Sequence, residues 1–174
     1  MLSKLERLSD IAAVVGAALM VPLVVAMVYE VLSRHLFGAP TIWAFELSYM
    51  MMSGIFSLGF AYALKYRQHV NVDFIYGSLR PRWRAVVDLV GYTIFLPCAV
   101  AVSSGMFQYA LRAYRSGEVS GVSSWNPVVW PLRAVLFTGF AILSLQALVE
   151  VIRCVRTLVT GEAQDTENAE AGLI

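Results

Sequence analysis

Four long apolar stretches constrain this sequence more than any motif in it. They cover about 11–32, 42–64, 85–111 and 128–152, and each provides the roughly 20 mainly apolar residues that a helix needs to cross about 30 Å of hydrocarbon. The composition agrees, because 59% of the residues are hydrophobic and 14% are charged, against about 45–50% and 25% in soluble domains. We therefore predict an all-α integral membrane protein, with four transmembrane helices in a single domain over residues 1–160.

The distribution of Lys and Arg predicts the orientation of these helices, because positively charged flanking segments stay in the cytoplasm. With the N-terminus inside, nine basic residues fall in the inner segments and three in the outer ones. Both termini are therefore expected in the cytoplasm. The inner residues are Lys4, Arg7, Lys65, Arg67, Arg80, Arg82, Arg84, Arg153 and Arg156, and the outer ones are Arg34, Arg112 and Arg115.

The inner segment 65–84 mixes apolar and basic residues. A short amphipathic helix over about 71–79 could lie in the headgroup layer, with its Lys and Arg neighbours near anionic lipid. An irregular loop with aromatic anchors is the alternative. The last segment, 161–174, is acidic and rich in small polar residues, so we expect a disordered cytoplasmic tail.

Ionisable side chains near the ends of the spans need partners, because charges in the hydrocarbon are costly. On the outer side, Glu30 and Arg34 are one helical turn apart, and Glu46 and Arg133 lie near the starts of the second and fourth spans. We expect Glu46 and Arg34 to join the first two helices across their short turn. On the inner side, the expected pairs are Asp88 with Arg84, and Glu150 with Arg153, Lys65 or Arg67.

Small residues recur at four-residue spacing along the second span, at Ser53, Ser57 and Ala61, and in the first span at Ala13 and Ala17. Such stripes let helix backbones approach closely. We expect them to pack within the bundle or against another membrane protein, and a ligand-lining role for the serines is the alternative.

Several classes of function lack the residues that they need. The two histidines, His35 and His69, fall on opposite sides of the membrane, so they cannot share one haem. The two cysteines are too few for a thiolate metal site, and there is no GxSxG or phosphate-binding loop. Without these residues, we expect no cofactor and no enzymatic activity. The net charge is only +1, and we expect no nucleic-acid partner. A self-sufficient transporter is disfavoured because nothing polar converges at mid-membrane to hold a solute, but it remains an alternative, as does a membrane redox protein.

Short motifs along most of the chain resemble the small membrane subunit of tripartite ATP-independent periplasmic (TRAP) transporters. The first is the turn with Arg34, Phe37 and Gly38, and the second leads into the next span with Trp43, Ala44 and Glu46. A basic pair then precedes the His-Val-Asn-Val-Asp run from His69 to Asp73. Phe45 stands where family members often carry an acidic residue, and only Trp125, Pro127 and Trp130 match the family's later turn.

The resemblance implies a scaffold subunit in the bacterial inner membrane, for sodium-gradient-driven uptake of an organic acid such as a C4-dicarboxylate or sialic acid. A large multi-span membrane subunit would carry the substrate and sodium sites, and a periplasmic binding protein would deliver the solute. Arg34, Trp43 and Glu46 would then fix the outer edge of the small subunit, where topology also suggests a contact with the binding protein.

Overall fold

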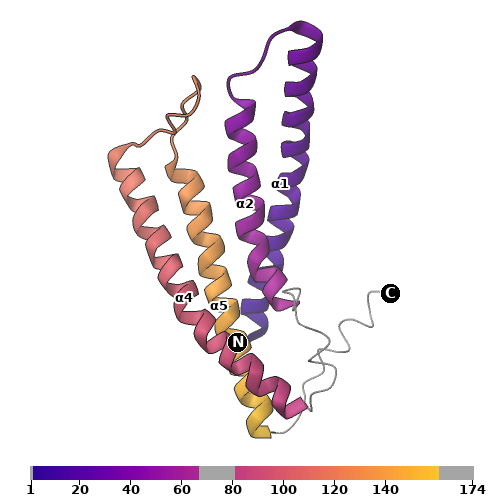
Figure 1. The fold of residues 1–174 in the computed structure, drawn as a ribbon, viewed down its shortest axis with the longest axis vertical. Helices are drawn as coiled ribbons and strands as arrows, with labels where there is room; N and C mark the ends of the chain where they lie inside the picture. The colour runs from indigo at the N-terminus through magenta and orange to yellow at the C-terminus, as the bar shows by residue number, and fades with distance from the viewer. Residues whose placement is uncertain (1, 67–80, 161–174) are drawn as a thin grey trace.

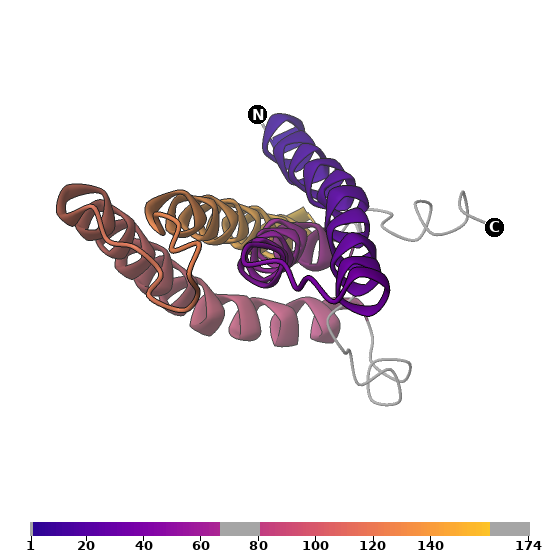
Figure 2. The same cartoon turned by 90° about the horizontal axis from the view of Figure 1, so that it is seen from above.

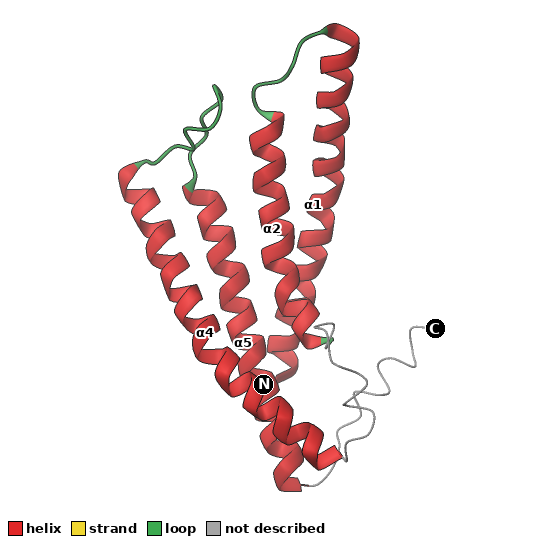
Figure 3. Cartoon of the chain, viewed as in Figure 1, coloured by secondary structure: helices red, strands yellow, loops and turns green. Residues whose placement is uncertain are grey.

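The computed structural model describes residues 2–66 and 81–160 of the chain. In these residues the chain forms four helices: α1 (Leu2–Phe37), α2 (Ala44–Lys65), α4 (Pro81–Ser116) and α5 (Trp130–Thr160) (Figures 1 and 3). All four are long and apolar enough to cross a membrane. The prediction of an all-α protein with four transmembrane helices is confirmed, whereas the segment predicted at 71–79 and the tail at 161–174 lie outside the described residues.

Three of the helices extend well beyond the apolar stretches that predicted them. At about 1.5 Å per residue, α2 is about 33 Å long and matches the hydrocarbon thickness, whereas α1 and α4 reach about 54 Å. Hydropathy marks only the part of a helix that is apolar, but the backbone hydrogen bonds continue into the polar flanks. Pro22 and Pro97 lie inside α1 and α4, and neither ends its helix.

The helices form two antiparallel hairpins, α1 with α2 and α4 with α5, which meet mainly where α2 packs on α5. A smaller contact joins α1 to α5. The hairpins converge at one end and separate toward the end that carries the connections 38–43 and 117–129 (Figures 1 and 2). We call the latter the loop end, and the opposite end the N-terminal end.

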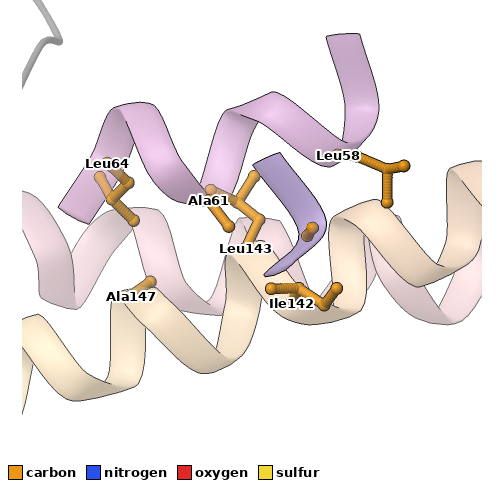
Figure 4. Close-up of a cluster of buried hydrophobic side chains, with 7 residues drawn as sticks. Leu58, Ala61, Leu64, Ile142, Leu143 and Ala147 are labelled. Atoms are coloured by element: carbon orange, nitrogen blue, oxygen red, sulfur yellow. The ribbon is translucent and has the colours of Figure 1, made fainter. Parts of the chain in front are cut away.

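Small side chains allow α2 and α5 to approach closely. Leu58, Ala61 and Leu64 of α2 point toward residues of α5 in the buried apolar cluster (Figure 4). Nearby, Ser57 is 1% exposed, and an added Cβ at Gly139 would lie 2.5 Å from its carbonyl oxygen. The other members of the cluster are Ala12 of α1 and Ile142, Leu143 and Ala147 of α5.

This contact shows where the small-residue stripe of the second span lies. Ser57 and Ala61 are buried within the bundle, whereas Ser53 is only half-buried and its hydroxyl donates to the Tyr49 carbonyl of the same helix. Gly139, on the opposing helix, was not singled out from the sequence. A glycine in an apolar span becomes informative only when the helix that faces it is known.

The two outer helices leave most of their surface open. Only 17% of the most apolar window of α1 is buried, and 11% of that of α4, against 39% for α5. In a membrane-spanning chain, these open apolar faces contact lipid or another membrane protein.

We predict that Gly139→Ala separates α2 from α5. The new methyl group would overlap the Ser57 backbone, and overpacking of this kind costs about 1–3 kcal/mol. A lower melting temperature and a lower yield of folded protein in detergent would show the effect.

Gly105→Ala on α4 is the matched control, because an added Cβ there meets nothing within 4 Å. It should leave the melting temperature unchanged or raise it slightly, since alanine favours a helix over glycine. Equal behaviour of the two variants would contradict the assignment of Gly139 as the point of closest approach.

Candidate functional site

The loop end holds a buried carboxylate on α1 that organises the first connection. Glu30 is 8% exposed and accepts hydrogen bonds from Arg34, whose Nε lies 3.1 Å away. It also accepts from the backbone N–H of Thr41 at 2.9 Å and from the Thr41 hydroxyl. Glu30 therefore joins the end of α1 to the connection that leads into α2.

Glu46, in the first turn of α2, is 2% exposed and binds a different connection. Its carboxylate accepts hydrogen bonds from the Ser120 hydroxyl and from the Ser123 hydroxyl, the latter at 2.8 Å. The prediction that Glu46 pairs with Arg34 is therefore wrong, since no ion pair between these two described residues is present. Arg34 finds an acceptor one turn earlier on its own helix, and Glu46 faces the second hairpin.

An aromatic contact, rather than an ion pair, joins α1 to the start of α2. The rings of Tyr29 and Trp43 stack with centroids 5.9 Å apart. Trp43, which the sequence assigned to the outer edge, is thus half-buried at the beginning of α2.

The connection 117–129 is an ordered hairpin-like loop. Val119 and Val128 form an isolated β-bridge, and the Gly121 N–H donates to the Asn126 side chain at 2.7 Å. Gly117, with φ of 62°, ends α4 in the left-handed conformation that glycine adopts most readily. The loop therefore presents Ser120 and Ser123 to Glu46 in a defined geometry.

Arg133 of α5 lies at the centre of a second group of contacts. The residue is 7% exposed. Its guanidinium donates two hydrogen bonds to the Glu118 carboxylate, at 2.6 and 2.5 Å. It also donates to the Tyr109 hydroxyl at 2.8 Å and lies 3.5 Å from the centre of that ring. Arg133 thereby fastens both helices of the second hairpin to their connection.

The electrostatics of this pair follow from its geometry. The hydrogen bonds from Arg133 lower the pKa of Glu118 below its ordinary value of 4.5, against a smaller opposing effect of desolvation. The sequence placed Arg133 in the outer layer but did not identify Glu118 as its partner.

A chain of polar side chains links α1 to α5 at the N-terminal end. The Ser9 hydroxyl donates to Gln146 at 3.0 Å, and the Gln146 amide donates to Glu150 at 2.9 Å. Arg153 donates to the same Glu150 oxygen at 3.1 Å, which is one of the three pairings predicted for Glu150 from the sequence. Ser9, Gln146 and Glu150 are each 1% exposed, so this chain is almost fully removed from solvent.

Lys65 at the end of α2 binds Asp10 of α1, with Nζ–O distances of 2.6 and 2.8 Å. Reasoning from the sequence missed Asp10, Ser9 and Gln146. The i, i+4 spacing of Gln146 and Glu150 inside an apolar stretch was the available signal for a buried polar pair.

The remaining predicted residues of the inner side are only partly described. His69 and Asp73 lie outside the described residues, as does the side chain of Arg84. Asp88 lies on α4 and is half-buried, so its predicted pairing with Arg84 stays a prediction.

The described polar groups mainly bind one another. Within residues 2–66 and 81–160, no three or more His, Cys, Asp or Glu side chains converge as metal ligands would. The arrangement therefore cross-links helices and connections: Glu46, Arg133 and Gln146 each join segments that are distant in the sequence.

We predict that Gln146→Leu destabilises the bundle by about 1–3 kcal/mol, because it leaves the buried Ser9 hydroxyl and one Glu150 hydrogen bond unmatched. Thermal unfolding of the purified chain would measure the loss. Gln108→Leu, at an exposed position of α4, is the matched control and should change little. If both variants unfold at the wild-type temperature, the buried hydrogen bonds of Gln146 contribute no net stability.

We also predict that acidification weakens the 117–129 connection through Glu118. Because its pKa is lowered in the folded state, the stability from this carboxylate is complete at pH values above its ordinary pKa of 4.5. This stability is lost as the pH falls through the lower pKa that Glu118 has in the folded state. Hydrogen exchange of the loop amides between pH 7 and pH 3 should show this loosening in the wild type, after correction for the intrinsic pH dependence of exchange.

Glu118→Gln should loosen the loop already at pH 7 and reduce its further response to acid. Parallel pH profiles for the wild type and this variant would show that other carboxylates cause the acid response.

Comparison with known proteins identifies the family of this chain. The family model for the DctQ component of tripartite ATP-independent periplasmic transporters matches residues 23–157. The chain is also similar to the sialic acid TRAP transporter permease protein SiaT of Haemophilus influenzae (strain 86-028NP), with 23% identity over 123 residues. These residues are 70% of this chain and 20% of that protein, so the chain spans about a fifth of the relative's length. The family match includes Glu30, Glu46, Arg133 and Gln146, and the chain belongs to the DctQ component family of the TRAP transporters.

Proposed function

We propose that this chain is the small permease subunit of a TRAP transporter and acts as a scaffold for a large multi-span membrane subunit. The observation that carries the proposal is the family match combined with its extent: the chain corresponds to about a fifth of a sialic acid TRAP permease. A role as one part of a larger permease fits this proportion. The substrate and sodium sites would then lie on the large subunit, and this chain would need no cofactor and catalyse no reaction.

The polar contacts of the bundle support a scaffold role. Glu46 holds a connection to α2, Arg133 closes the second hairpin, and Gln146 joins α1 to α5. Such links restrict the motion of the helices, as a fixed support for a moving partner requires.

The open surface of the bundle suggests where the partner packs. The small-residue stripe of α2 packs against α5 at Ser57 and Ala61, so it is a poor candidate for the contact with the large subunit. The faces of α1 and α4 are the least buried, and we assign the lateral contact with the large subunit to one of these helices.

The proposed orientation places both termini in the cytoplasm and the loop end in the periplasm of a bacterial inner membrane. The ordered connection 117–129 would then face the periplasmic binding protein that delivers the organic acid. Its exposed basic neighbour Arg112 is the first residue to test in that contact.

The proposal predicts that the tagged chain, extracted from native membranes in mild detergent, co-purifies with a large multi-span protein in about equal amount. Mass spectrometry would identify the partner. Glu46→Gln should lower the amount of assembled complex more than the transport rate per complex, because the amide offers one acceptor oxygen to the two serines instead of two.

Thr138→Val, at an exposed position of α5, is the control for that substitution and should assemble normally, because the Thr138 hydroxyl donates only to a carbonyl of its own helix. Recovery of this chain alone, active after reconstitution, would instead support a self-sufficient transporter, and a haem or quinone spectrum would support a redox protein. Normal assembly of Glu46→Gln with abolished transport would give Glu46 a direct part in transport.

A further inference from the structure

An apolar groove of about 650 Å³ runs between α4 and α5. It extends from Leu96 and Leu148 to Phe107 and Phe137, with Ala141 between them. The residues of α5 that line it differ from those that pack on α2, so the groove opens on another face of the second hairpin. Its length, from Phe137 to Leu148, is about 16 Å at 1.5 Å per residue, close to half of the roughly 30 Å hydrocarbon thickness.

The wall of the groove offers few polar groups to a partner. The hydroxyls of Ser104 and Ser144 turn back onto their own helices and donate to the carbonyls of Ala101 and Phe140, each at 2.8 Å. Transmembrane helices commonly associate through hydrogen bonds as well as close packing. Both of these hydroxyls already donate within their own helices, and Ser103, the third serine of the wall, is only 8% exposed. The surface that the groove offers is therefore almost wholly apolar, which favours an apolar occupant.

The loop end of the groove is polar and aromatic. Phe107 and Phe137 touch with centroids 5.2 Å apart. Seven residues farther along each helix toward the loop end, and hence on the same faces, Tyr114 and Trp130 make an edge-to-face contact at 5.5 Å. Tyr and Trp favour the depth of the lipid headgroups, so this pair marks the mouth of the groove.

A basic side chain stands beside that mouth. Arg115 follows Tyr114 directly, is exposed, and takes part in none of the ion pairs found in the described part of the chain. A guanidinium at headgroup depth is complementary to a lipid phosphate.

From this combination we infer that the α4–α5 groove binds one acyl chain of an anionic phospholipid from the leaflet at the loop end, with the phosphate at Arg115. The apolar wall suits an acyl chain, and the length of the groove matches one leaflet of the bilayer. The Arg115 guanidinium is complementary to the negative charge of the phosphate. This site does not depend on the scaffold role, because it uses only residues of this chain.

Native mass spectrometry of the full-length chain, titrated with phosphatidylglycerol or phosphatidylcholine in mild detergent, tests the inference. We expect one phospholipid to remain bound after partial delipidation, with about a fivefold preference for phosphatidylglycerol, as expected from one basic side chain near the phosphate. Ala141→Phe, which fills the groove, should abolish this retention. Ala18→Phe, at an exposed position of α1, should retain it.

Arg115→Gln supplies a second test that does not depend on core packing. It should keep the bound lipid but remove the preference for phosphatidylglycerol. Equal retention by Ala141→Phe and Ala18→Phe, or an unchanged preference in Arg115→Gln, would overturn the proposal. Cross-linking of Leu145→Cys to a second membrane protein in native membranes would also overturn it, by assigning the groove to a protein partner.

Discussion

The close approach of α2 and α5 at Ser57 and Gly139 is the contact on which the rest of the structure depends. It is the main junction between two hairpins that otherwise separate toward the loop end, and it exists because glycine leaves room for a neighbouring backbone. Alanines on both helices continue the contact toward the N-terminal end. In a bilayer, where lipid is as apolar as leucine, packing of this kind carries much of the association between helices.

Polar contacts lie on either side of that junction and set its geometry. At the loop end, Glu46 fixes the connection of the second hairpin, and at the opposite end Gln146 reaches Ser9 of α1. Glu46 and Gln146 are both buried, and their hydrogen bonds would be costly to lose in apolar surroundings. The two hairpins are thus held at both ends by hydrogen bonds and near their middle by packing.

The features that the sequence predicted are those that depend on local spacing. The four spans follow from hydropathy, and the pairs Glu30–Arg34 and Glu150–Arg153 follow from residues one helical turn apart. The partners of Glu46 and Arg133 could not be read in this way, since a carboxylate at a helix end has several basic and hydroxyl groups within reach. Ser9 and Gln146 are 137 positions apart, and only the packing of α1 on α5 brings them together.

The distribution of charge between the hairpins bears on how such a chain enters a membrane. Each ion pair described above lies within one hairpin: Asp10–Lys65 and Glu30–Arg34 in the first, Glu118–Arg133 and Glu150–Arg153 in the second. The contacts that cross between hairpins, Ser9 with Gln146 and the two loop serines with Glu46, use neutral donors. During synthesis, each hairpin can therefore leave the insertion machinery with these charges already compensated. Among the contacts described above, lateral docking of the two halves then uses hydrogen bonds from neutral donors and the fit of small side chains.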